Sequence, residues 1–237
     1  MPTTIKTKGI ILKISETPGK DKLLHILTDS AYLTAFVTPK RSAGKKSYTF
    51  DLFTYGEFVL YETDNGNYLV NSVTPDEYFF GLRENIERLS AASYFAELAR
   101  YASGDTDCDF KSLTELLLCS FRLLENGKRV RSVKPVFELK TAQLLGMTPC
   151  LEAEKKAGTY YFDLDDGRLY IENRPGCILM PRSAVYEIYR IIMSEPESAF
   201  SCISDSEEET VYTAAQQYII YHTEREFSSL RFLNGVI

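Results

Sequence analysis

The residues best suited to bind a polyanion lie in the stretch TPKRSAGKKSYTFDLF, which spans residues 38–53. Its four cations are followed by three aromatic residues; they are Lys40, Arg41, Lys45 and Lys46, then Tyr48, Phe50 and Phe53. Lysine and arginine neutralise phosphates and release counterions, and aromatic faces stack on unpaired bases. The alternative is a solvated loop followed by core aromatics, since charged loops that contain glycine are common between strands. The stretch alone does not decide between these interpretations.

Charge is distributed unevenly along the 237-residue chain, whose formal net charge is −6. Residues 1–50 contain nine Lys and Arg against three acids, whereas residues 151–237 contain eight against fifteen. A polyanion would therefore meet the N-terminal part of the chain. Further candidate phosphate contacts there are Lys6, Lys8, Lys13, Lys20 and Lys22. We expect about half of the candidates to be right, because alternation along a strand sends some to the far face.

A second basic cluster follows a predicted helix and is placed to extend the same path. It consists of Lys128, Arg129, Arg131 and Lys134. An equally weighted alternative is that these cations compensate the negative end of a helix dipole.

Composition limits the class of protein. No apolar run approaches the roughly 18 residues of a membrane helix, and the N-terminus lacks the apolar segment of a signal peptide. Five scattered cysteines without a CxxC pair indicate reduced thiols. We expect a cytoplasmic protein without a membrane partner.

The first 75 residues contain five short segments with a period of two, separated by turn residues. They are residues 5–14, 22–28, 32–37, 52–61 and 68–73, with Gly56 a candidate β-bulge. This spacing is typical of a small barrel, and the five-stranded oligonucleotide/oligosaccharide-binding (OB) fold fits best. The basic stretch would lie on its rim, between the third and fourth strands. We predict an OB-fold nucleic-acid-binding domain over residues 1–76.

Beyond residue 76 the apolar period changes to 3.6, which predicts a helical domain over residues 77–237. Asp76 is a candidate cap for the first helix. Further helices are expected at residues 110–125, 133–145 and 181–193 and from residue 205 onward, with Pro135 in a first turn. A β-hairpin is expected around residues 158–174. The predicted fold class is α+β.

Signatures of catalysis are missing from the sequence. It contains no GxxxxGK[ST], GxGxxG, GxSxG or HExxH motif. The acidic groups at residues 163–166 and 207–209 fit a hairpin turn and a helix start, and His25 and His222 fit structural or surface roles. This pattern favours a binding protein that is not an enzyme. One alternative is an interaction scaffold with weak or indirect DNA contact, and another is a hydrolase or transferase assembled from scattered residues.

Three stretches taken in order resemble the RecO family of DNA repair and recombination mediators. They are residues 7–50, with the opening strands and the basic loop; PVFELKTAQLLGMTP at residues 135–149; and YIIYHTEREFSSLRFL at residues 218–233. The resemblance covers nearly the whole chain. It implies binding of single- and double-stranded DNA, annealing of complementary strands, and loading of the RecA recombinase with RecR onto DNA coated with single-strand binding protein. Single-strand binding protein and RecF are the further candidate partners, and the bacterial nucleoid is the implied location.

Many members of the family place two CxxC pairs around the inserted hairpin to hold zinc. Here only Cys150 and Cys177 remain near TYYFDLDDGRLYIENR, and two thiols do not close a tetrahedral site. We therefore expect no cofactor, with the hairpin held instead by Tyr160, Phe162, Leu164 and Tyr170.

Overall fold

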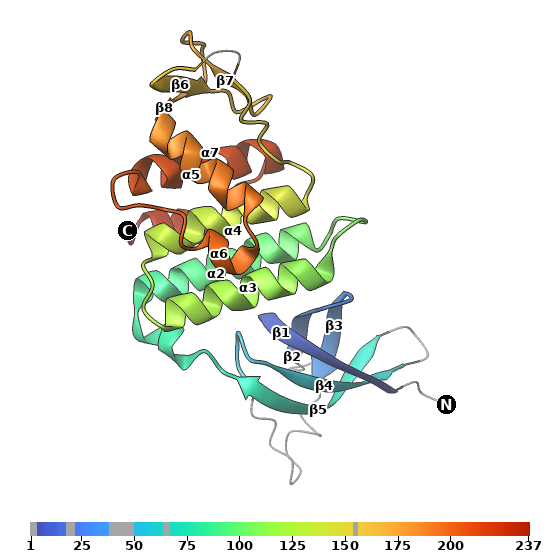
Figure 1. The fold of residues 1–237 in the computed structure, drawn as a ribbon. Coiled ribbons are helices and arrows are strands. Elements are labelled where there is room, and N and C mark those ends of the chain that lie inside the picture. The colour runs from blue at the N-terminus through green and yellow to red at the C-terminus, as the bar shows by residue number, and fades with distance from the viewer. Residues whose placement is uncertain (1–3, 18–21, 38–49, 64–66, 154–155) are drawn as a thin grey trace.

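The computed structural model describes residues 4–17, 22–37, 50–63, 67–153 and 156–237. It shows a β-barrel at one end of the molecule, a stack of helices next to it and a small β-sheet at the far end (Figure 1). The α+β class and the OB-like N-terminal barrel predicted from the sequence are confirmed. No helix in these ranges is long and apolar enough to cross a membrane.

Five strands form the barrel in the order β1-β2-β3-β5-β4, which closes on itself. Their bounds are β1 Thr4–Glu16, β2 Lys22–Thr28, β3 Tyr32–Val37, β4 Tyr55–Glu62 and β5 Tyr68–Glu77. Neighbours are antiparallel except for β3 and β5. Alternate side chains fill the interior, among them Ile11, Leu24 and Phe58. This alternation is what made the strands recognisable in the sequence.

The fourth strand starts later than predicted. It begins at Tyr55, because residues 51–54 form a turn in which Thr54 N–H donates to the Asp51 carbonyl at 3.0 Å. Phe53 has a φ of 68°, a left-handed conformation, and its side chain is buried. The predicted irregularity at Gly56 is confirmed as a register shift between β4 and β5.

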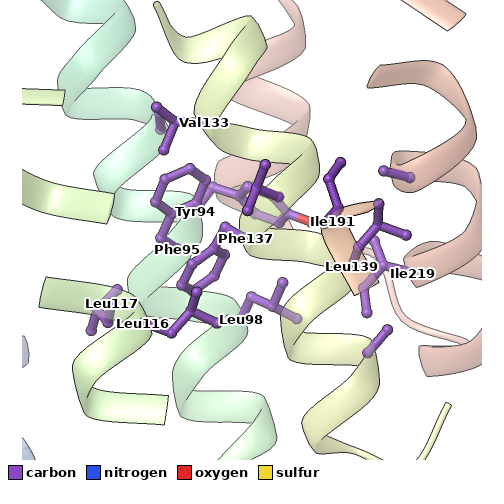
Figure 2. Close-up of a cluster of buried hydrophobic side chains, with 14 of the residues drawn as sticks. Tyr94, Phe95, Leu98, Leu116, Leu117, Val133, Phe137, Leu139, Ile191 and Ile219 are labelled. Atoms are coloured by element: carbon purple, nitrogen blue, oxygen red, sulfur yellow. The ribbon is translucent and has the colours of Figure 1, made fainter. Parts of the chain in front are cut away.

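Helices account for most of the second half of the chain. Their bounds are η1 Phe80–Glu84, α2 Ile86–Ala102, α3 Phe110–Glu125, α4 Val130–Leu144, α5 Arg182–Met193, α6 Pro196–Ala199, α7 Glu208–Thr223 and α8 Ser228–Asn234. Figure 2 shows the core shared by α2, α3, α4, α5 and α7, where the rings of Phe95 and Phe137 stack with centroids 4.4 Å apart.

Two predicted helix starts are wrong. Asp76 lies in β5 and caps nothing; α2 is capped by Asn85, whose side chain accepts from the Arg88 N–H at 3.1 Å. Helix α4 begins at Val130, so Pro135 lies inside the helix and not in its first turn. In both cases the element boundary differs from the local sequence signal, because tertiary context overrides local propensity.

The inserted hairpin is a three-stranded sheet of β6 (Thr159–Phe162), β7 (Leu169–Tyr170) and β8 (Ile178–Pro181). Tyr160 and Phe162 are buried as expected, and the Phe162 ring lies 5.6 Å from that of Tyr218 on α7. Leu169 is the buried residue of β7, whereas Tyr170 contributes to the hairpin from the surface. The Tyr170 hydroxyl instead donates to Asp166 at 2.6 Å on the surface.

Barrel and helices pack through a shared apolar interface. The ring of Phe121 on α3 meets Phe53 and Phe79 edge to face, with centroids 5.0 and 5.5 Å away. Arg122 donates to both carboxylate oxygens of Glu77 at the end of β5. The buried hydroxyl of Thr114 donates to the Thr28 carbonyl at 3.2 Å. The helical domain therefore covers one end of the barrel, including the side chains of Ile10, Leu12 and Leu27, and leaves the rest of the outer strand surface as the available binding surface.

Candidate nucleic-acid interface

Strands β1 and β2 carry two exposed cations that have no ion-pair partner among the described residues. Lys13 on β1 lies opposite His25 on β2, and His25 lies opposite Thr34 on β3. Lys22 opens β2. Lys13 and Lys22 are exposed, and neither forms an ion pair within the described ranges. Along β2, Lys22 alternates with Leu24 and Ile26, which point into the barrel, so it lies at the rim where β2 begins, opposite Glu16 on β1. We call the outer surface of these three strands, together with Lys22 at its rim, the β1–β2–β3 face.

Aromatic and aliphatic side chains lie beside these lysines. Leu23 pairs with Phe36, and Phe36 with Leu69 on β5, so the three side chains share the outer side of the barrel. All three are half-buried. OB barrels bind single-stranded nucleic acid with this combination, in which cations contact the phosphate backbone and aromatic side chains contact the bases.

Two other predicted contacts lie on the neighbouring β1–β4–β5 face, where they are neutralised. Lys6 Nζ is 2.9 Å from a Glu57 carboxylate oxygen, and Lys8 Nζ is 2.9 Å from Asp76. The hydrogen bond and charge of Asp76 raise the pKa of Lys8. A phosphate at Lys6 or Lys8 would have to compete with a carboxylate, so this face is the poorer site.

The basic stretch begins and ends at fixed points of the barrel. Val37, the last residue before it, pairs with Lys22. Asp51, which lies within the stretch and after its last cation, forms an ion pair with Arg83. The Arg83 hydrogen bond lowers the pKa of Asp51, and the charge of Lys22 contributes to the same shift. The predicted contacts within or near this stretch lie outside the described residues and stay predictions; they are Lys20, Lys40, Arg41, Lys45, Lys46 and Tyr48. Phe50 packs against the barrel interior and Phe53 is buried, so the core interpretation holds for these two aromatics.

Sequence patterns missed a hydrogen-bond chain on the β1–β2–β3 face. The Ser15 hydroxyl lies 3.3 Å from Nε2 of His25, and Nδ1 of His25 lies 2.8 Å from the Tyr32 hydroxyl. A serine–histidine contact can activate a nucleophile, but here the third member is a phenol where a triad has a carboxylate. The strand register, which the sequence does not display, brings the three together. The arrangement orients Tyr32 at the junction of barrel and helices.

His25 makes stability depend on pH. Burial, with the nearby charges of Lys13 and Arg100, lowers the pKa of His25. The unfolded chain therefore binds a proton before the folded one does, and stability is lost as pH falls below about 6.5. We expect the melting temperature to drop more between pH 7.5 and 5.5 in the wild type than in a His25→Gln variant. Equal drops, measured by thermal scans in matched buffers, would contradict this assignment.

The second basic cluster is held by acids of the helical domain. Arg129 pairs with Asp205 and, at 3.0 Å, with Glu208, and Arg131 pairs with Glu209. Arg129 and Arg131 lie at the start of α4, so compensation of a helix C-terminus is the wrong explanation for them.

The two lysines of the cluster differ in exposure. Lys134 is fully buried. Lys128 is exposed, and its N–H donates to the Leu123 carbonyl at the end of α3. The charges of Arg129 and Arg131 are explained by the acids that pair with them inside the protein. The proposed interface therefore does not include the second basic cluster.

Comparison with known proteins fits this architecture. A family model described as "Recombination protein O C terminal" matches residues 83–231, which is more than half of the chain. The chain belongs to the RecO family. A DNA repair protein RecO from Acetivibrio thermocellus is 24% identical over 97% of this chain and 96% of its own length. A RecO from Caldicellulosiruptor bescii is 30% identical over 71% of both chains. Membership confirms the resemblance and supports a role in DNA repair.

The hairpin of this RecO chain does not fit the zinc ion implied by its family. Cys150 and Cys177 are the only cysteines near the sheet, and the described residues contain no group of three His, Cys, Asp or Glu arranged to bind a metal. Burial and the neighbouring Asp163 raise the pKa of Cys177, which opposes formation of the thiolate that zinc requires. The absence of a cofactor stays a prediction, and no step of the proposed function passes through a metal.

Proposed function

We propose that this RecO chain binds single- and double-stranded DNA through the outer surface of its barrel, anneals complementary strands, and helps RecR load RecA onto single strands coated with single-strand binding protein. The observation that supports this most directly is the β1–β2–β3 face, where exposed Lys13 and Lys22 lack carboxylate partners in the described ranges. The comparisons support the coarser role in DNA repair.

Annealing needs no covalent step, and so the proposal assigns no catalytic residue. Two strands approach each other only when their phosphate charges are screened, and the released counterions favour binding. A cationic barrel face can do this while the bases stay accessible for pairing. RecR, RecF and single-strand binding protein are proposed as partners in the bacterial cytoplasm, where the DNA substrate lies.

The two barrel faces provide a matched test. Replacing Lys13 and Lys22 with Gln should weaken binding to an oligothymidylate roughly 10- to 30-fold near 0.1 M salt, because each lost phosphate contact lowers the slope of log K against log salt by about 0.7. The matched control replaces Lys6 and Lys8 with Gln, which removes the same charge from lysines that are already paired. Fluorescence anisotropy at several salt concentrations measures both slopes.

The Lys6/Lys8 variant shows whether a change in salt slope comes from a lost phosphate contact or from the lower total charge. A smaller change in the Lys6/Lys8 variant supports the β1–β2–β3 face as the phosphate path. Equal changes in the two variants would show that only total charge matters. Wild-type protein that fails to bind either DNA form would overturn the proposed function and favour the scaffold alternative.

A further inference from the structure

Two aromatic rings stack in the open where the barrel joins the helices. The rings of Tyr78 and Phe80 are nearly parallel, with an interplanar angle of 8° and centroids 5.0 Å apart. Phe80 is 57% exposed, so more than half of its surface remains open to solvent beside the contact with Tyr78. Parallel, offset stacking of this kind is also how an aromatic side chain receives a nucleobase.

The backbone is strained in a way that places Phe80 outside. Phe79 has φ 52° and ψ 45°, a left-handed conformation that is a genuine outlier for a bulky residue. This turn sends Phe79 into the core against Phe121, and leaves the next side chain, Phe80, at the surface. Strain of this kind persists where surrounding packing fixes it, and it concentrates at functional sites.

An arginine fixed by other contacts lies over the same ring. The Arg83 guanidinium carbon is 5.9 Å from the Phe80 ring centre. Arg83 also pairs with Asp51 and donates to the Leu52 carbonyl at 2.8 Å, so it is held in place. Lys22 on the β1–β2–β3 face is close enough to contribute to lowering the pKa of the same Asp51 carboxyl. The Arg83–Asp51 ion pair thus places the platform next to the C-terminal part of the basic stretch, residues 38–53, to which Asp51 belongs.

Charges around the platform are balanced, which points to the base and not the phosphate as its ligand. Arg83 is paired with Asp51, and Arg122 with Glu77. Lys8 is paired with Asp76. A phosphate would have to displace one of these carboxylates, whereas a neutral base needs only an open ring face.

We infer that the Tyr78–Phe80 pair is a stacking platform for an unpaired nucleobase of single-stranded DNA. The inference rests on the proposed function and adds a site to it. Such a platform would hold a single strand by a base while neighbouring bases remain free to pair. Duplex DNA, whose bases are already stacked, would gain nothing from it.

Removing the ring is the first test. We expect Phe80→Ala and Phe80→Leu to weaken oligothymidylate binding about 5-fold to about 150-fold, the range measured for base–aromatic stacking. The salt slope should stay unchanged, since no phosphate contact is lost. The matched control is Phe232→Ala on α8, whose ring is also 57% exposed. Unchanged melting temperatures will show that the variants are folded.

The chain contains no tryptophan, so a single substitution gives a specific optical probe. Phe80→Trp should keep single-strand affinity, and its fluorescence should be quenched by an oligonucleotide but not by an abasic oligomer of equal length. A Trp at position 232 should show no quenching. If the wild type binds single strands, either of two results would overturn the platform alone. One is unchanged affinity in Phe80→Ala, and the other is the absence of quenching in Phe80→Trp. Failure of the wild type to bind any single strand would overturn the proposed function as well.

Discussion

Replacing Lys134 with Met should destabilise the protein by about 3–5 kcal/mol, the usual result of removing one partner from a buried ion pair. Lys134 and Glu138 both have 0% exposed side chains, and Lys134 Nζ lies 2.9 Å from one carboxylate oxygen of Glu138. The Tyr94 hydroxyl donates to Glu138 at 2.8 Å, and Lys134 lies 3.9 Å from the ring centre of Tyr212. Without the ammonium, the Glu138 charge would be left in an apolar core between α2, α4 and α7.

The size of the effect should depend on pH. Burial already raises the pKa of Glu138, against the opposing charge of Lys134. Without Lys134, the folded state keeps a proton on Glu138 to a higher pH than the unfolded state does. The variant is therefore penalised least at low pH, and its deficit grows as pH rises above the ordinary range of a carboxyl. Urea unfolding at pH 5 and pH 8 measures this difference.

Two further variants separate a lost charge partner from lost packing. Replacing Lys134 with Met and Glu138 with Leu together should restore most of the stability, because buried ion pairs are often replaced by apolar side chains without loss. Lys128→Met, a change at an exposed site on the preceding turn, should stay within about 0.5 kcal/mol of the wild type. A double variant as unstable as Lys134→Met would show that shape, and not charge, is the cause.

Lys134 also shows where sequence reasoning stops. It stands in the sequence as one of four cations around a turn, and only the packing of α4 against α7 shows that it is buried. Arg129 and Arg131 meet acids more than seventy residues away, which no local pattern can reveal. The strands, by contrast, were predictable because a buried interior imposes a period of two on each of them.

The same limit applies to the candidate interface. The excess of cations in residues 1–50 could be read from composition, but the separation of Lys13 from the paired Lys6 and Lys8 depends on strand register. The outward position of Phe80 depends on the left-handed backbone of Phe79, since two adjacent phenylalanines give no hint of which is buried. Local periodicity thus predicts elements, while tertiary contacts decide which charges and rings remain available.

Reversing Lys40, Arg41, Lys45 and Lys46 to Glu should have the largest effect on DNA binding. These residues lie outside the described ranges, but both ends of their segment are held by the barrel, at the Val37–Lys22 pair and at the Asp51–Arg83 ion pair. The fold should therefore survive the change. Loss of four phosphate contacts lowers the single-strand salt slope by about 2.8, which near 0.1 M salt means roughly several-hundred-fold weaker binding.

A control with the same change in net charge separates contact from overall repulsion. Four exposed arginines of the helical half can be reversed together; they are Arg168, Arg174, Arg182 and Arg190. They belong to the region of the small sheet and to α5, and Figure 1 shows the small sheet at the opposite end of the molecule from the barrel. We expect that variant to lose little affinity, because charges more than a Debye length, about 10 Å at 0.1 M salt, from the strand are screened. Filter binding at two salt concentrations compares the variants. Equal losses would show that the basic stretch acts only through total charge, and an unchanged slope in the folded first variant would remove it from the DNA surface.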